Sequence, residues 1–208
     1  RVQLPSGETW ISGGERWMPF GYIPTLLRGQ EGLVIAAGAP RVRVGPAPEG
    51  QERHEVMADV HLGTEGEARF EVTETFRGGG AIGWRGQLEE IPAAELQRRF
   101  EQGYVARLVP GAELQSIDIA ARDKPDEPLV VKYTFTVSDL GRRNGARWIV
   151  PGLFPLQLGA SFVPRASRTT TQLIPGETDE RITIRFHAAE SALPRAPAAV
   201  ALRGPGGA

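Results

Sequence analysis

The stretch "HEVMADVHLGTEGEARFEVTETF", residues 54–76, alternates apolar and polar side chains on both sides of a short turn. Alternation with a period of two places every second side chain on the same face of a β-strand. Residues 63–66 interrupt the pattern, and charged residues occupy much of the opposite face. The stretch therefore predicts an antiparallel hairpin with one buried and one solvated face. The residues predicted to share the buried face are Val56, Ala58, Val60, Leu62, Ala68, Phe70, Val72 and Phe76.

The segment that follows this hairpin has the apolar spacing of helices. Apolar residues recur at helical steps from Ala81 to Ile91, and again from Leu96 to Leu108. Pro92 between the two runs suits the first turn of a helix, because its missing N–H needs no partner there. A helical pair is therefore predicted near residues 81–109, with a kink at Gly103.

Strand patterns return after the helical pair. Residues 112–121 and 129–139 alternate, and residues 168–188 predict a further hairpin that turns at Pro175-Gly176. One more strand is predicted at residues 200–202. The fold class that follows is mainly β (α+β), an antiparallel β-sandwich-like domain with an inserted helical pair. Further residues predicted to point inward are Val131, Tyr133, Phe135, Val137, Ile182, Ile184 and Phe186.

The composition excludes several classes of function. The chain of 208 residues has no cysteine, which excludes disulfides, thiolate metal sites and a cysteine nucleophile within it. A formal net charge of −1 provides no global field for nucleic acid. No apolar run approaches the ~20 residues that span a bilayer, so no membrane span is predicted.

Residues 1–52, which precede the β domain, have shorter predicted elements and more proline and glycine between them. Residues 1–12 predict a small hairpin, residues 19–29 an ordered loop with two prolines and two glycines, and residues 32–38 a short strand. Proline, glycine and charged residues then accumulate, which is typical of a connection between domains. We place a first unit at 1–44, a linker at 45–52 and the β domain at 53–208.

The segment "ETWISGGERWMPFGYIPTLLRG", residues 8–29, resembles the end of the transglutaminase-like core in large bacterial multidomain proteins. In that family a strand carrying the catalytic aspartate is followed by a loop like "PFG.lP..lrG..aLv", which residues 19–34 resemble. Residues 126–137, "DEPLVVKYTFTV", and residues 147–155, "RWIVPGLFP", resemble the C-terminal β domain of the same proteins. The resemblance covers most of the chain loosely, and its first motif is moderately specific.

The resemblance implies a role without catalysis for this chain. Such a core works through Cys, His and Asp, and its Cys and His would lie upstream of Arg1. Ser12 stands at the aligned position of the catalytic aspartate, with Glu8 or Glu15 as substitutes if the alignment shifts. We therefore expect no enzyme activity and no cofactor. Residues 1–44 would be terminal strands and a loop of the core, and the chain would be part of a longer protein.

The leading hypothesis is a non-catalytic accessory region that braces the upstream transglutaminase-like core of the same polypeptide. The resemblance also implies a periplasmic or secreted location and a protein or cell-envelope partner. The alternative is an independent β-sandwich module that binds a glycan or peptide on exposed aromatic side chains, for which Trp17, Trp84 and Trp148 are candidates. A hydrolase acting through this chain alone is the third hypothesis.

Two further sequence patterns could indicate binding sites, but local structure explains them better. Residues 78–83, "GGGAIG", satisfy G-x-G-x-x-G, but the preceding strand is hairpin-paired and no second βα unit follows, so a flexible turn explains them better than a dinucleotide site. His54 and His61 are seven residues apart on one strand and face opposite sides, and His187 is isolated. We therefore predict no metal site.

The last candidate is a cluster of arginines with a tryptophan. Its members, Arg142, Arg143, Arg147 and Trp148, could contact an anion or a saccharide through guanidinium and indole groups. Asn144-Gly145 at its centre is equally a strong signal for a hairpin turn. We favour the hairpin, since turn chemistry explains every residue.

Overall fold

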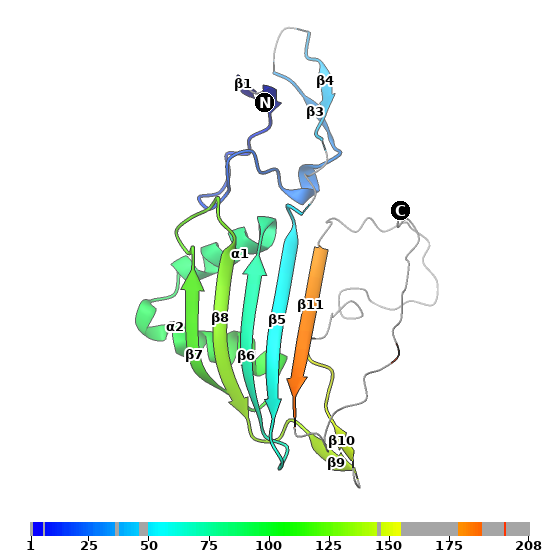
Figure 1. Cartoon of the computed structure of the whole chain (residues 1–208). Helices are drawn as coiled ribbons and strands as arrows, with labels where there is room; N and C mark the ends of the chain where they lie inside the picture. The colour runs from blue at the N-terminus through cyan, green and yellow to red at the C-terminus, as the bar shows by residue number, and fades with distance from the viewer. Residues whose placement is uncertain are drawn as a thin grey trace, which may run out of the picture.

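The structure is a computed structural model that describes residues 2–5, 7–35, 38–45, 50–144, 147–154, 179–188 and 198. Its main body is a five-stranded sheet with helices against one face (Figure 1). The sheet has the order β11-β5-β6-β8-β7. The bounds of its strands are β5 Arg53–Leu62, β6 Ala68–Phe76, β7 Ala112–Ala120, β8 Leu129–Val137 and β11 Asp179–His187.

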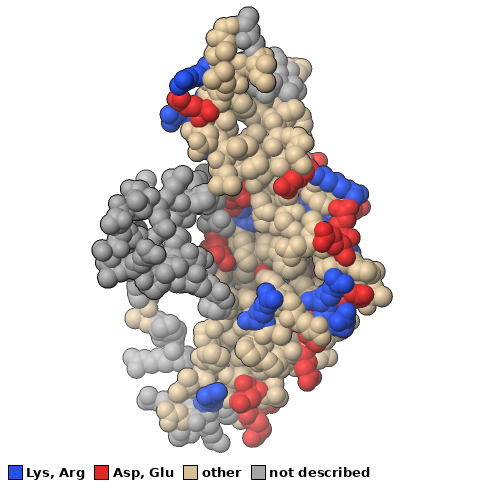
Figure 2. Space-filling view, turned by 180° about the vertical axis from the view of Figure 1, so that it is seen from behind, with Lys and Arg blue, Asp and Glu red and all other residues tan. Residues whose placement is uncertain are grey.

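The helices occupy the connection between β6 and β7 and lie behind the sheet in Figure 1. A continuous helical stretch follows the first helix, and it passes through a π-helical turn around Gly103, where the sequence predicted a kink. The bounds are α1 Gly78–Glu89, η2 Ala93–Glu95, α2 Leu96–Phe100, η3 Glu101–Val105 and α3 Ala106–Leu108. Figure 2, seen from this side, shows positive and negative side chains interspersed.

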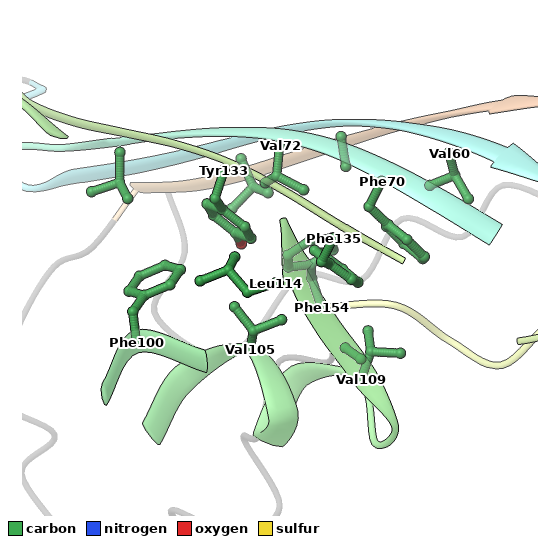
Figure 3. Close-up of a cluster of buried hydrophobic side chains, with 14 of the residues drawn as sticks. Val60, Phe70, Val72, Phe100, Val105, Val109, Leu114, Tyr133, Phe135 and Phe154 are labelled. Atoms are coloured by element: carbon green, nitrogen blue, oxygen red, sulfur yellow. The ribbon is translucent and has the colours of Figure 1, made fainter. Parts of the chain in front are cut away.

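The core lies between the helices and the facing side of the sheet. Phe70 and Phe135 are fully buried and stack with ring centroids 4.3 Å apart. In Figure 3, Phe100 and Val105 point from the helices toward Tyr133 on β8. The eight residues that the alternation of residues 54–76 assigned to one face are all buried. The alternation of apolar residues thus specified the buried face of the hairpin, because every second side chain of a strand points to the same face.

The predicted class, mainly β and α+β with an inserted helical pair, is confirmed. Two details need correction. The layer that covers the five-stranded sheet is made of helices, and no second large sheet is found among the described residues. The strand pair β11–β5 is parallel, where antiparallel strands were predicted throughout. The first strand of the hairpin predicted at 168–188, and the strand predicted at 200–202, lie outside the described residues.

The segment before the domain forms short two-stranded units. The predicted hairpin at the N-terminus is confirmed as β1 (Val2–Leu4) paired with β2 (Gly7–Thr9). A 3₁₀ turn, η1 (Thr25–Leu27), precedes a second hairpin of β3 (Glu31–Leu33) and β4 (Arg41–Arg43). Beyond β8, the short strands β9 (Arg142–Asn144) and β10 (Arg147–Ile149) pair antiparallel, which confirms the hairpin reading of the arginine cluster.

The glycine-rich segment of residues 78–83 is helical, and its reading as a flexible turn was wrong. Helix α1 begins at Gly78, and the Glu52 carboxylate accepts a hydrogen bond of 2.8 Å from the Gly79 N–H. A carboxylate suits this place because the first N–H groups of a helix have no partner within it. The N-terminus of α1 is therefore capped by a side chain from the segment that precedes β5.

Gly78→Ala should destabilise the protein by about 1–3 kcal/mol, the usual cost of holding an L-residue in a sparsely populated backbone conformation. Gly78 has φ +58°, and a Cβ there would lie 2.5 Å from the Gln51 carbonyl oxygen. The matched control is Gly83→Ala in the same helix, where a Cβ meets nothing within 4 Å. This control should stabilise by about 0.5–1 kcal/mol. Urea denaturation followed by circular dichroism measures the free energy of unfolding of both variants. Equal effects would contradict the special role of the Gly78 backbone conformation.

Candidate functional site

The most unusual side chain of the domain is Glu74, a carboxylate on the core-facing side of β6. Its exposed fraction is 0%, and it lies between Val72 and Phe76 in the alternation. Its strand neighbours in register are Val56 on β5 and Val131 on β8. A carboxylate in such surroundings requires hydrogen-bond donors, because a buried charge without partners is very costly.

Three side chains from three different elements supply these donors. His54 Nε2 on β5 lies 2.7 Å from Glu74 Oε2. Tyr133 on β8 donates its hydroxyl to Oε1 at 2.6 Å. Tyr104 in the π-helical turn donates to Oε2 at 2.7 Å. We call these four residues the Glu74 network. Tyr104 belongs to the π-helical turn, a departure from α-helical geometry that is frequent at functional sites.

The surroundings fix the protonation of the network. Burial, and then the charge of Glu74, raises the pKa of Tyr104 and of Tyr133, so both phenols keep their protons and act as donors. Burial alone would lower the pKa of His54. The hydrogen bonds and charges of Glu74 and of Glu180 outweigh it and raise that pKa above its ordinary 6.5. Glu180 Oε1 lies 3.3 Å from His54 Nδ1, on the side away from Glu74.

Aromatic rings enclose the network. His54 stacks on Phe76 with centroids 4.4 Å apart, and Trp84 meets Tyr104 edge to face at 5.1 Å. Phe100 packs against both tyrosines, with centroids 5.1 Å from each. The site reaches solvent mainly through His54, whose side chain is 22% exposed. Chemically, the arrangement can hold and release a proton at His54, while its own donors occupy the carboxylate.

A groove of about 380 Å³ lies elsewhere, at the end of the sheet beside the turn between β5 and β6. It is open, and its lining includes polar side chains from four strands and from the turn between β5 and β6. They include His61, Glu67, Arg69, Glu113 and Thr136. His187, which appeared isolated in the sequence, stacks on His61 at 4.5 Å because β11 and β5 pair in register. Among the described residues, no three His, Asp or Glu side chains gather in a way that could hold a metal ion.

The N-terminal segment, residues 1–44, has an excess of exposed apolar side chains among its described residues. It is tied to the domain by Arg28, which bonds the Glu52 carboxylate at 2.7 Å and lies over the ring of the buried Tyr22. Arg16 and Trp17 both bond Glu89 near the end of α1. Six of the eight large apolar side chains that are exposed among the described residues belong to this segment. They are Ile11, Phe20, Leu26, Leu27, Leu33 and Ile35.

The residues singled out in the sequence are dispersed. Ser12 lies in the loop after β2 and is half-buried. Arg142 is exposed on β9, while the side chains of Arg143, Arg147 and Trp148 lie outside the described part. Trp84 packs inside the aromatic cluster and Trp17 bonds Glu89, so these two rings do not form a common platform.

The opposite facing of His54 and His61 is confirmed, since His54 joins the core side and His61 the outer side of the sheet. The Glu74 network itself was not predicted. The signal for it was a glutamate at a core-facing position of the alternation, between Val72 and Phe76.

Comparison with known proteins gives no relative. No protein-family model, no curated protein and no solved structure matches this chain. Within the described ranges, no helix is both long enough and apolar enough to cross a membrane.

Proposed function

We propose that this chain is a non-catalytic accessory region whose N-terminal segment packs against a transglutaminase-like core in the same polypeptide. The observation that carries the proposal is the gathering of exposed apolar side chains in residues 11–35. Exposed apolar residues scattered singly along a chain are normal, but six within one short segment favour a docking segment. The resemblance of residues 8–29 to the end of such a core supports the choice of partner.

The attachment of the segment to the domain supports a bracing role. The Arg28–Glu52 ion pair is largely buried, with side chains 9% and 10% exposed. Arg28 Nη1 is buried and has no acceptor among the described residues. A packed partner would cover the exposed apolar side chains of the segment, and this burial stabilises the contact. The segment would thus connect the domain rigidly to the core.

The Glu74 network supports a structural rather than a catalytic role for the domain. Three donors of this chain occupy the carboxylate, so no substrate can reach it without breaking those bonds. Fully satisfied polar networks of this kind rigidify and specify a core. The resemblance extends the proposal to a periplasmic or secreted location and a cell-envelope partner.

Replacing the exposed apolar side chains should weaken docking. Phe20→Ser, Leu26→Ser and Leu33→Ser should each weaken binding of the separately produced upstream core by about tenfold to a hundredfold. That range corresponds to the roughly 1.5–3 kcal/mol gained by burying such a side chain. Isothermal titration calorimetry measures the affinity. The control is Met57→Ser, which removes an exposed apolar side chain from the outer face of the sheet. Equal effects of all four substitutions would contradict the proposal.

A further inference from the structure

Strand β11 is the least buried strand of the main sheet. Its inward side chains Ile182, Ile184 and Phe186 are only half-buried, whereas the facing residues of β5, β6 and β8 are buried. It lies at the edge of the sheet and pairs with β5 alone among the described strands. Its attachment therefore depends more on backbone bonds and charged contacts than that of the other strands.

Charged contacts join β11 to β5 along its length. Asp179 bonds Arg53 at 2.9 Å near the start, and His187 bonds Asp59 at 2.8 Å at the end. Glu180 bonds His54 Nδ1 at 3.3 Å. The last contact differs from the others, because the second nitrogen of the same imidazole bonds the buried Glu74.

We infer that His54 is a pH-sensitive tie between the edge strand β11 and the buried carboxylate of Glu74, and that β11 docks less tightly once the imidazole loses its proton. A protonated imidazole has two N–H groups and donates to both carboxylates, whereas the neutral ring has one. The remaining proton stays on Nε2, which donates it to Glu74, because this carboxylate is fully buried and its bond to the ring is the shorter one. The lone pair of Nδ1 then faces the Glu180 carboxylate, which is one-third exposed and turns to water.

The groups around His54 support this order of events. Glu74 faces it from β6, Glu180 faces it from β11, and Tyr133 and Tyr104 reach it through Glu74 from β8 and the π-helical turn. On β5 itself, Arg53 and Glu55 flank it and pair with each other. Phe76 and Trp84 add aromatic surfaces that do not titrate.

The sign of the effect follows from the Glu180 carboxylate, whose charge and hydrogen bond raise the pKa of His54 while β11 is docked. A group whose pKa is higher in the docked state stabilises that state fully below its undocked pKa. The stabilisation is lost as the pH rises through the docked pKa. Release of β11 is therefore favoured on the alkaline side of the His54 titration.

Nuclear magnetic resonance tests the inference on the whole chain. The His54 imidazole shifts report its titration, and amide exchange gives the protection factors of β11 relative to those of β6 and β8 at each pH. We expect the relative protection of β11 to fall as His54 deprotonates. The fall should be about tenfold for each unit by which docking of β11 raises the pKa of His54. Constant relative protection through the titration would overturn the inference.

Two variants separate His54 from the other imidazole that contacts β11. Glu180→Gln removes the carboxylate that meets Nδ1, so the pH dependence of β11 protection should disappear while β6 and β8 stay protected. His187→Asn removes the histidine bonded to Asp59, and the pH dependence should persist. The reverse pattern would assign the effect to His187 and overturn the inference.

Discussion

Glu74→Ala should lower the free energy of unfolding by about 3–5 kcal/mol, the largest loss that we expect from one substitution in this chain. The truncation leaves the hydroxyls of Tyr104 and Tyr133 without their acceptor, and it leaves His54 without the carboxylate that favours its charge. Buried donors without partners each carry a desolvation penalty of about 1–3 kcal/mol. The removed volume adds the cost of a cavity. Urea denaturation with tryptophan fluorescence measures the loss.

Two control variants show how much of the loss in Glu74→Ala comes from the buried position of Glu74 and how much from its charge. Glu71→Ala removes a glutamate from the opposite, exposed face of the same strand and should change stability by no more than about 0.5 kcal/mol. Glu74→Gln keeps the volume and one acceptor oxygen, so its loss should be smaller than that of Glu74→Ala. If Glu74→Ala and Glu71→Ala had equal effects, the Glu74 network would not hold the core together.

The second large effect is expected at Arg85, where Arg85→Ala should destabilise by about 3 kcal/mol, because buried acceptors left without donors each cost about 1–3 kcal/mol. Arg85 is 1% exposed, and its Nη2 donates to the carbonyls of Ala121 and Glu127 at 3.0 and 2.6 Å. These bonds close the turn between β7 and β8, in which Ala121 has a positive φ of 58°. Removing the guanidinium leaves these carbonyls without their donor and a strained turn without its anchor.

Matched arginine variants test this account. Arg107→Ala removes an exposed arginine of α3 and should change stability by no more than about 0.5 kcal/mol. Arg85→Lys keeps a charge but loses the planar fork that reaches several carbonyls at once, so an intermediate loss is expected. Hydrogen exchange of residues 121–128 should accelerate in Arg85→Ala. Unchanged exchange in that turn would contradict its anchoring by Arg85.

Much of the fold could be predicted because the burial of its elements follows their periodicity. The hairpin of β5 and β6 alternates over its whole length, and the helices repeat apolar residues at helical steps. The parallel pairing of β11 with β5 could not be predicted in this way, since Arg53 and Asp179 are 126 positions apart. Local patterns specify which face of a strand is buried, but they do not specify its neighbour.

The Glu74 network escaped prediction for a related reason. Its donors lie 20, 30 and 59 positions from Glu74, so no spacing rule connects them. Tyr104 reaches the carboxylate from a π-helical turn, a local departure that helical periodicity does not indicate. The alignment of Ser12 with a catalytic aspartate and the linker at 45–52 stay predictions.

A neighbouring domain that covers the N-terminal segment would slow the exchange of its backbone amides. Hydrogen exchange with mass spectrometry should compare residues 11–35 in this chain alone with the same residues in the product of the complete reading frame. We expect a transglutaminase-like core upstream and at least tenfold slower exchange around Phe20, Leu26 and Leu33 in the longer protein, with unchanged exchange at Met57. Equal exchange in both proteins, or a reading frame that encodes no such core, would contradict the account.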